Sequence, residues 1–288
     1  MTKFSRDPEV FDTSALLSDK AFNRHSMNED RSHSSPYDND TVQVGVDGLR
    51  VKLIQGVDQQ KFKEVLSRAT KATTGIAVDS PPDDRDWEDM MRGGLQAALE
   101  TQTVVFEVTG ASRALTHQLV RSRKAGFHQQ SQRATFYGNG PEVRMPESIW
   151  QNERAKKAWL EARTASLKAY EIACDEDISY QDARFILPEA TTNYILCEYS
   201  VREFINVYAY RACSLFMWEM VAVMRSMRNE LVFQSPWLAD HIKISCEKSK
   251  KCTFQGWEDV EDQCDLPWAK EDNRVFVPSE HLRIRRGK

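Results

Sequence analysis

The segment Thr103–Thr109 constrains the fold of this chain more than any other. It reads Thr-Val-Val-Phe-Glu-Val-Thr, is rich in β-branched residues, and is followed at once by Gly110. Such a run predicts a strand, and glycine is common where a strand ends or bends. Ser112 can cap a helix that begins directly after it. The segment therefore predicts a strand that leads straight into a helix.

Two further strands are expected closer to the N-terminus. Apolar residues alternate with other residues on both sides of the dipeptide Asp47-Gly48: Val42, Val44 and Val46 before it, and Leu49, Val51 and Leu53 after it. Asp-Gly between two alternating runs is typical of a two-residue turn. The sequence therefore predicts a β-hairpin over residues 42–53.

Helical periodicity marks several other segments. Asp58 can cap a helix whose apolar positions recur at intervals of three and four, at Phe62, Val65, Leu66 and Ala69. The other expected helices are one with Trp87, Met90, Met91 and Leu95, a long amphipathic one with Ala155, Trp159, Ala162, Ala169 and Ala173, and two across 201–229. Strands and helices in separate stretches of the chain indicate an α+β fold.

Composition suggests one domain over residues 41–240. Residues 1–40 are polar without periodicity, which predicts a flexible N-terminal arm, and residues 241–288 form a polar C-terminal extension. With 41% hydrophobic residues the chain can bury a sizeable core. No run of about 18 apolar residues occurs, and the first residues lack the apolar core of a secretory signal, so a cytoplasmic protein is expected. The net charge of −4 excludes a strongly cationic surface, and neither nucleic acid nor a membrane is an expected partner.

The six cysteines contain no Cys-x-x-Cys pair, so free thiols are expected rather than a disulfide framework or a zinc ribbon. Cys246, Cys252 and Cys264 can be drawn together with His241 as a metal site. Their gaps fit no standard ligand spacing, however, and the stretch between them is rich in lysine. The sequence therefore predicts no metal.

The segment 118–133 concentrates groups that bind phosphate. Arg121, Arg123 and Arg133 carry planar guanidinium groups that can hold phosphate oxygens in pairs, and Gln118 and neighbouring polar residues supply neutral donors. Arginines two apart on a helix point to different sides, so Arg121 and Arg123 would not hold one ligand group there. The alternative is a solvated basic end of a helix.

The spacing in this segment resembles the signature of the flavin-dependent thymidylate synthases, which is Arg-His-Arg, seven residues and then Ser. This chain has Arg121-Ser122-Arg123, then residues 124–130, then Ser131, so serine replaces the histidine. Gln118, three residues before the first arginine, and Arg133, two after the serine, also follow the family.

Later motifs extend the resemblance over roughly residues 42–237. Residues 183–188, Ala-Arg-Phe-Ile-Leu-Pro, are similar to the family's Ala-Arg-x-x-Leu-Pro element, with Arg184 as its arginine. Arg202, Asn206 and Arg211 follow at the family's intervals, and Trp218-Glu219 lies where the family has a Trp-Glu pair.

The resemblance implies two sets of binding residues. Those expected to bind a pyrimidine nucleotide are Gln118, Arg121, Gln129, Gln130, Ser131, Gln132, Arg133, Arg184 and Arg211. Those expected to contact flavin are Thr73, Ala98, Arg121, Ser122, Arg123, Gln129, Ser200, Val201, Arg202 and Asn206. Arg211 is similar to the arginine that polarises the pyrimidine ring near N3, and it is the expected catalytic residue, because a fixed cation stabilises negative charge that develops on the ring.

Structural interpretations of the later arginines remain open. Arg202 and Asn206 can form a satisfied polar pair at the start of a helix, and Arg211 can form a buried ion pair with Glu219 or with another acidic residue.

The chain also departs from the family. Residues 96–102, Gln-Ala-Ala-Leu-Glu-Thr-Gln, lack most of an element that lies on the flavin and folate side in the family. Gln129 replaces an acidic residue, and Ser200 replaces an asparagine near the flavin. The nucleotide arginines are kept while the cofactor side differs, as expected of a specialised paralogue.

The resemblance implies a central sheet flanked by helices, and a homotetramer with active sites between subunits. It implies FAD-dependent methylation of dUMP or UMP at C5, with methylenetetrahydrofolate as carbon donor and NADPH as reductant. Three alternatives stay open: a UMP methylase or hydroxymethylase of a modified-nucleoside pathway, a non-catalytic nucleotide-binding paralogue without flavin, and a structural or interaction protein.

Overall fold

The computed structural model describes residues 41–75, 77, 79, 85, 88, 90–91, 96–138, 140–254 and 264. The expected arm over residues 1–40, and most of the extension beyond 254, lie outside this set. The described residues form two compact units: a first unit of residues 41–45 with Gln130–Thr192, and a second unit of Val46–Gln129 with the residues from Asn193 onward. The expectation of a single domain over 41–240 stays a prediction.

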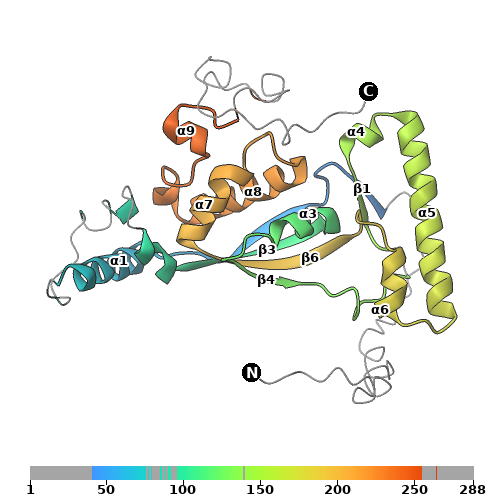
Figure 1. Cartoon of the computed structure of the whole chain (residues 1–288), viewed down its shortest axis with the longest axis horizontal. Coiled ribbons are helices and arrows are strands. Elements are labelled where there is room, and N and C mark those ends of the chain that lie inside the picture. Colours follow the sequence, from blue (N-terminus) through green and yellow to red (C-terminus); the bar gives the residue numbers. More distant parts are fainter. Residues whose placement is uncertain are drawn as a thin grey trace, which may run out of the picture. The chain divides into compact units, whose positions relative to one another are not determined.

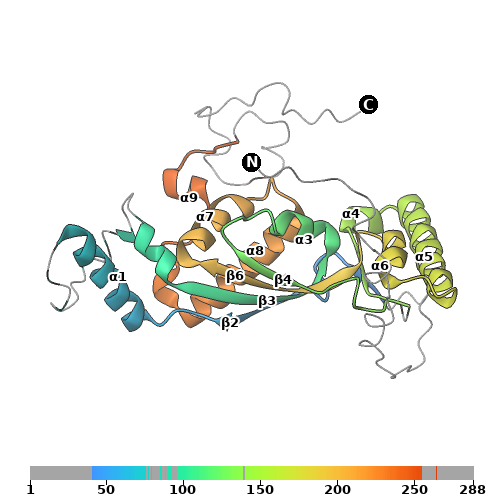
Figure 2. The same cartoon turned by 60° about the horizontal axis from the view of Figure 1, so that its bottom comes forward.

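The second unit contains a four-stranded sheet in the order β2-β3-β6-β4 (Figure 1 labels β3, β6 and β4, and Figure 2 also labels β2). β2 (Arg50–Gln55) pairs antiparallel with β3 (Thr103–Ser112), and β4 (Gly126–Gln129) pairs antiparallel with β6 (Thr192–Ser200). Val104, Phe106 and Val108 alternate along β3 and are fully buried. This two-residue period is what a half-buried strand requires, and the strand expected over Thr103–Thr109 is confirmed.

Three helices of the second unit pack near this sheet: α3 (Arg113–Leu119), α7 (Val201–Arg211) and α8 (Trp218–Gln234). Figure 2 shows α3 and α7 on one side of the strands. Ser112 caps α3 as expected, since its hydroxyl accepts the N–H of Leu115 at 3.1 Å. The two helices expected across 201–229 are confirmed as α7 and α8.

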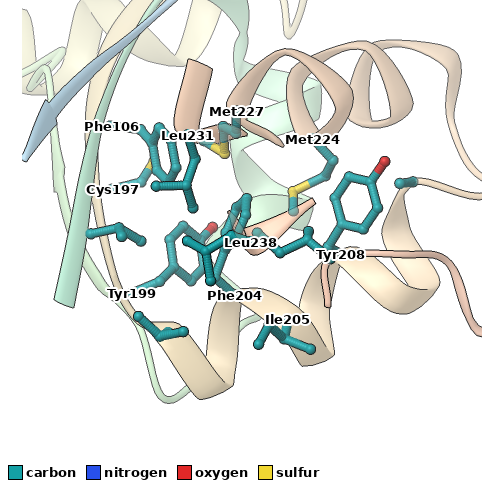
Figure 3. Packing of buried hydrophobic residues seen from close by; sticks show 14 of the residues in the cluster. Phe106, Cys197, Tyr199, Phe204, Ile205, Tyr208, Met224, Met227, Leu231 and Leu238 are labelled. Carbon is teal, nitrogen blue, oxygen red and sulfur yellow. The ribbon is translucent and has the colours of Figure 1, made fainter. Parts of the chain in front are cut away.

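The core of the second unit lies between the strands and these helices. Figure 3 shows Phe106 and Tyr199 from the strands beside Phe204 of α7 and Leu231 of α8. The Phe204 ring centroid lies 5.1 Å from that of Phe106 and 5.8 Å from that of Tyr199. Such tilted aromatic contacts add to the stabilisation that burial of the rings provides.

The described part of the second unit also contains α1 (Gln59–Thr74) and three short helices: η5 (Ala97–Thr101), η7 (Pro236–Leu238) and α9 (Ser245–Ser249). Asp58 caps α1 by accepting the N–H of Lys61 at 2.8 Å, as expected. Of the helix expected around residues 87–95, Trp87 and Leu95 lie outside the described residues, whereas Met90 and Met91 are helical.

The first unit contains a two-stranded parallel sheet of β1 (Val42–Val44) and β5 (Val143–Met145). Its helices are α4 (Glu147–Trp150), α5 (Glu153–Asp175), α6 (Tyr180–Ala183) and η6 (Arg184–Ile186). The long helix is confirmed, and its expected face is confirmed only in part: Ala155, Trp159 and Ala173 are half-buried, and Ala173 packs against the buried cluster of this unit. The buried residues of α5 are Arg163, Leu167 and Tyr170, while Ala162 and Ala169 are exposed. Larger side chains bury more area than alanine, and they determine which face turns inward.

The hairpin expected over residues 42–53 is also wrong. β1 pairs with β5, and β2 pairs with β3, so the two strands do not pair with each other. Gly45 has a φ of 56°, and its N–H donates to the carbonyl of Met145 at 3.0 Å. Gly45 therefore lies in the connection between two strands that belong to different sheets. Each strand pairs with a segment distant in the sequence, and the local turn signal does not determine that pairing.

The expected α+β class is confirmed by these helices and sheets. No helix among the described residues is long and apolar enough to cross a membrane.

Candidate functional site

The arginine turn, residues 120–125, follows α3 and is not helical. Its backbone N–H groups at Arg121, Ser122 and Ala125 donate to carbonyls three residues earlier, at 3.1–3.2 Å. Arg121 and Arg123 are exposed, and neither forms an ion pair with another described residue. On a helix, Arg121 and Arg123 would point to different sides, but this turn is not helical and the objection does not apply. Both guanidinium groups therefore have N–H donors available for a ligand.

Gln118 lies at the end of α3, beside the start of α8. Its side-chain amide donates to the sulfur of Met217 at 2.9 Å, and Met217 is the residue that precedes α8. The half-buried side chain thus links α3 to the segment between Arg211 and Trp218.

Glu219 joins the other end of α3 to α8. Its carboxylate, which is only 1% exposed, accepts the N–H of Ser112 at 2.8 Å and the hydroxyl of Ser112 at 2.5 Å. Among the described residues, Arg211 forms no ion pair with Glu219; its guanidinium lies 5.3 Å from the centroid of the Phe216 ring. Within the described part of the chain, the buried ion pair between Arg211 and Glu219 that the sequence left open is therefore not formed.

Gln129 forms part of a half-buried polar network. Its amide nitrogen donates to the hydroxyl of Thr116 at 2.6 Å and to the side-chain oxygen of Asn193 at 2.8 Å. Asn193 in turn donates to the carbonyl of Ala111 at 2.7 Å. Both amide hydrogens of Gln129 are used inside the protein, so its side-chain oxygen is the atom left to accept from a ligand.

The other expected nucleotide residues belong to the first unit. Ser131 and Arg133 lie on an exposed turn, where the hydroxyl of Ser131 accepts the N–H of Arg133 at 3.2 Å. Gln130 and Gln132 flank Ser131 and are half-buried. Arg184 begins η6, and its Nε donates to the carbonyl of Gln181 at 3.1 Å, which leaves its terminal nitrogens for other partners. The single nucleotide site expected from these residues and from Gln118, Arg121, Gln129 and Arg211 stays a prediction.

A polar cavity of about 460 Å³ in the second unit contains two of the expected flavin residues. Ser200 caps α7 by accepting the N–H of Glu203 at 3.1 Å, and Arg202 donates to the carboxylate of Glu100 at 2.8 Å. The cavity is lined by Glu100, Thr103, Lys124, Gly126, Glu198, Ser200, Arg202 and Glu203. The structure therefore brings Ser200 and Arg202 together around one space.

Charges of both signs surround this cavity, which we call the α7 cavity. Burial raises the pKa of the Glu203 carboxyl above its ordinary value, and Lys124 opposes this by lowering it. Sequence reasoning missed Lys124, and it also missed Glu100, which lies in the stretch 96–102 where the family's motif is lost. Adjacency to Arg123 was the only sequence signal for Lys124.

Other expected flavin residues lie elsewhere in the second unit. Val201 is buried, and the hydroxyl of Thr73 donates back to carbonyls of α1, at Ala69 and Thr70. Asn206 is exposed on α7, while Ala98 is buried in η5. None of these four residues lines the α7 cavity. Their role in flavin binding stays a prediction.

The α7 cavity contains charged groups of both signs. The cations Lys124 and Arg202, with the N-terminus of α7, suit phosphate oxygens, while the three carboxylates suit hydroxyl and amino donors. A ligand that carries both kinds of group is therefore compatible with the residues present.

Comparison with known proteins supplies a family. The family model described as "Thymidylate synthase complementing protein" matches residues 50–237. A flavin-dependent thymidylate synthase of Geobacter sulfurreducens is 36% identical over 137 residues, which are 47% of this chain and 59% of that protein. A second one, from Pyrococcus abyssi, is 35% identical over 142 residues, 48% of this chain and 58% of the relative. The chain thus spans less than two thirds of the length of these relatives.

Solved structures share the fold. Thymidylate synthase X from Helicobacter pylori, solved with FAD and dUMP, has a TM-score of 0.51 at 19% identity and covers 67% of this chain and 99% of its own. The UMP/dUMP methylase PolB from Streptomyces cacaoi, bound with 5-Br dUMP, has a TM-score of 0.54 at 15% identity, covering 70% and 93%. These likenesses confirm the expected architecture.

Proposed function

Because the chain belongs to the thymidylate synthase complementing protein family, we propose that it is a flavin-dependent enzyme that methylates a uridine 5′-monophosphate at C5. The proposed substrate is dUMP or UMP, the carbon donor is methylenetetrahydrofolate, and the reductant is NADPH. The observation that carries the proposal is the family match over residues 50–237, which includes the arginine turn, Arg184 and Arg211.

In this proposal the arginines hold the nucleotide phosphate. Arg121, Arg133 and Arg184 would donate paired N–H groups to its oxygens, because a guanidinium matches phosphate in shape and charge. Support comes from the exposure of Arg121 and Arg133 and from the free terminal nitrogens at Arg184. The side-chain oxygen of Gln129 would accept a hydrogen bond from the nucleotide, since its amide hydrogens are already used.

Arg211 would act on the pyrimidine ring. Its guanidinium does not lose its proton near neutral pH, so it suits the stabilisation of negative charge at N3 or O4 and does not suit a role as base. The contact with Phe216 leaves its N–H groups available, because a ring face attracts the cation without accepting all of its donors.

Ser200, Arg202 and Lys124 would hold the flavin dinucleotide at the α7 cavity. Bound flavin supplies the hydride-transfer chemistry that no side chain can provide. Arg202 is already paired with Glu100, so a phosphate has to compete with that carboxylate or bind the outer side of the guanidinium.

Turnover and colour together test the proposal. The purified protein should be yellow or take up FAD in a fluorescence titration. With methylenetetrahydrofolate and NADPH it should release tritium from 5-tritiated dUMP or UMP, and omission of either co-substrate should stop the release. Mass spectrometry of the product separates methyl from hydroxymethyl transfer.

Two results would contradict the proposal. If the protein binds neither FAD nor a uridine monophosphate, both the proposed cofactor and the proposed substrate are rejected. A colourless protein that binds dUMP or UMP without turnover would instead favour a non-catalytic nucleotide-binding paralogue.

We also propose a homotetramer with active sites between subunits, on the same family membership. Light scattering after size-exclusion chromatography checks it: four chains are expected, and a monomer at micromolar concentration would reject it.

A further inference from the structure

A second cavity of the second unit is lined by cysteines. It has a volume of about 450 Å³, and four of the chain's six cysteines line it: Cys213, Cys246, Cys252 and Cys264. We call it the cysteine cavity. The expected nucleotide and flavin residues are absent from the described residues that line it, so it is distinct from the α7 cavity.

The local backbone explains how two of these cysteines come to one space. Cys246 lies in α9, and Lys250, the residue that follows this helix, is in the left-handed region with a φ of 55°. The N–H of Lys250 donates to the carbonyl of Cys246 at 2.8 Å, and the hydroxyl of Ser249 donates to the carbonyl of Lys251 at 3.0 Å. The chain thus reverses directly after Cys246, and Cys252 returns to the same cavity.

The other two cysteines come from more distant segments. Cys213 lies in the connection between α7 and α8, where its N–H donates to Tyr210 and its carbonyl accepts from Phe216. Cys252 is 6% exposed and packs in a small apolar cluster that includes Leu215 and Cys264. Segments far apart in the sequence therefore contribute thiols to one enclosed space.

Ordinary core packing, as of Cys252 against Leu215, explains only part of this gathering. Buried cysteines usually behave as small apolar side chains and pack against aliphatic neighbours. Here the thiols line a cavity that also contains Arg225 and Glu247, and no disulfide joins any of the four. Three of the four, Cys246, Cys252 and Cys264, lie beyond the family match, which ends at residue 237.

We propose that the cysteine cavity binds one Zn²⁺ ion through the sulfurs of Cys213, Cys246, Cys252 and Cys264. Four thiolates are a standard donor set for structural zinc, and such a site links segments that are distant in sequence. Binding converts each thiol to a thiolate, so protons are released as the four sulfur–zinc bonds form. No oxidant or reductant is involved.

The charges around the cavity favour this ion. Four thiolates and Zn²⁺ carry a net charge of about −2, which needs nearby cations. Arg225 lines the cavity, and Lys248, Lys250 and Lys251 lie in the segment between Cys246 and Cys252. The lysine-rich stretch, which in the sequence alone counted against a metal, therefore supplies cations that can balance the charge of a zinc centre with four thiolate ligands.

Binding requires local rearrangement. Among the described residues, no three side chains of His, Cys, Asp or Glu already lie in the arrangement of a metal site. The thiols therefore have to turn toward a common centre by rotation about their Cα–Cβ bonds.

Metal analysis of the full chain tests the proposal. After expression with added zinc and dialysis against a buffer free of metal, plasma mass spectrometry should find about one zinc per chain. Replacement by Co²⁺ should give strong near-ultraviolet absorption from sulfur-to-cobalt charge transfer, together with visible bands of a tetrahedral site. Neither readout depends on catalytic activity.

Variants identify the ligands. Cys252→Ser and Cys246→Ser should each lower zinc content at least several-fold and weaken the charge-transfer band. Cys174→Ser is the matched control, because Cys174 is a half-buried thiol of the first unit, and it should keep both. Circular dichroism checks the folding of each variant, and Cys264→Ser offers a ligand replacement at a less buried position if Cys252→Ser does not fold.

Three outcomes would overturn the proposal. The first is a folded chain with less than about 0.1 zinc after saturation with Zn²⁺. The second is equal zinc in the Cys246, Cys252 and Cys174 variants. The third is a disulfide among the four cysteines in the freshly purified protein, seen as a mass loss and as missing thiols in a reagent titration.

Discussion

Arg211 shows how one side chain can be placed by a helix and a ring. It is the last residue of α7, and its guanidinium lies 5.3 Å from the Phe216 ring centroid. A cation at the C-terminal end of a helix is favoured by the helix dipole. The helix end and the ring therefore both favour a cation at this position, and the planar edge of a guanidinium is the part that can pair with a pyrimidine.

We therefore expect Arg211→Lys to fold and to bind FAD as the parent does, but to lose on the order of 100-fold or more in turnover. Lysine keeps the charge and lacks the planar pair of donors. Steady-state rates with the preferred nucleotide measure the effect. Arg154→Lys, at an exposed position of α5, is the control and should keep the parental rate. Near-parental turnover in Arg211→Lys would give Arg211 a structural role.

Gln129 supplies a prediction about stability, because its amide is fixed by hydrogen bonds to Thr116 and Asn193. Gln129→Glu places a carboxylate against the side-chain oxygen of Asn193, and Asn193 cannot turn without leaving the carbonyl of Ala111 unpaired. We expect a loss of roughly 1–3 kcal/mol in the free energy of unfolding.

Urea denaturation of the Gln129 variant measures this loss. The control is Gln60→Glu, an exposed position in the first turn of α1, where the change should stay within about 0.5 kcal/mol. If Gln129→Glu is as stable as the control, the proposed orientation of the amide is incorrect.

At the scale of elements, α3 is fastened to the start of α8 at two points. Ser112 at its beginning is held by Glu219, and Gln118 near its end is held by Met217. The glutamate of the Trp-Glu pair in the sequence thus has a structural role: it accepts hydrogen bonds from the serine that caps α3. The arginine turn follows α3 directly, so its position depends on this attachment.

A double-mutant cycle on Ser112 and Glu219 measures the strength of the attachment. Glu219→Gln should cost about 1.5–3 kcal/mol, because hydrogen bonds to a charged group are lost in a buried place. The double variant, which also carries Ser112→Ala, should lose less free energy of unfolding than the sum of the two single variants, by on the order of 1 kcal/mol or more.

The control cycle pairs Ser112→Ala with Asp58→Ala. Asp58 caps α1, shares no bond with Ser112, and its loss should cost about 0.5–2 kcal/mol independently. Strict additivity in the Ser112–Glu219 cycle would show that the two residues act separately.

Local signals in the sequence predicted much of the secondary structure. Ser112 and Asp58 cap the expected helices, and the β-branched run became β3, because capping and strand alternation depend on neighbours in sequence. The hairpin failed because pairing is decided by segments far away: Val42 pairs with Val143, and Val51 with Val108. No turn signal encodes that choice.

The candidate site was predictable to a different extent. Spacing marked Arg202 and Ser200, and both line the α7 cavity. Glu100 and Lys124 were missed, because a pocket is assembled from side chains whose common position depends on the sheet register. The expected flavin residue Val201 turned inward for the same reason: helix phase, rather than motif position, sets burial.

At the scale of the whole molecule, nucleotide binding should appear as increased stability. A ligand that binds only the folded state at about 100 times its Kd adds about 2.7 kcal/mol to the free energy of unfolding. We expect dUMP or UMP at such a concentration to raise the Tm by at least about 5 °C. Scanning calorimetry with dUMP, UMP and dCMP measures this preference.

Arg184→Ala links that measurement to the candidate site. The variant should bind the preferred nucleotide with about 1.5–3 kcal/mol less affinity, so the same nucleotide concentration should give a smaller rise in Tm. Inorganic phosphate is the control ligand and should give little change. Equal shifts with phosphate and with all three nucleotides would contradict specific recognition of a uridine monophosphate.

The two compact units alternate along the chain, and this order has a consequence for biosynthesis. Residues 41–45 leave the ribosome before the rest of the first unit, Gln130–Thr192, because Val46–Gln129 of the second unit comes between them. The nascent β1 must wait for β5, and β3 must wait for β6. Exposed strand edges invite wrong pairing while they wait. Chaperone capacity during translation should therefore set the yield of folded protein, and no single cut in the chain can release either unit whole.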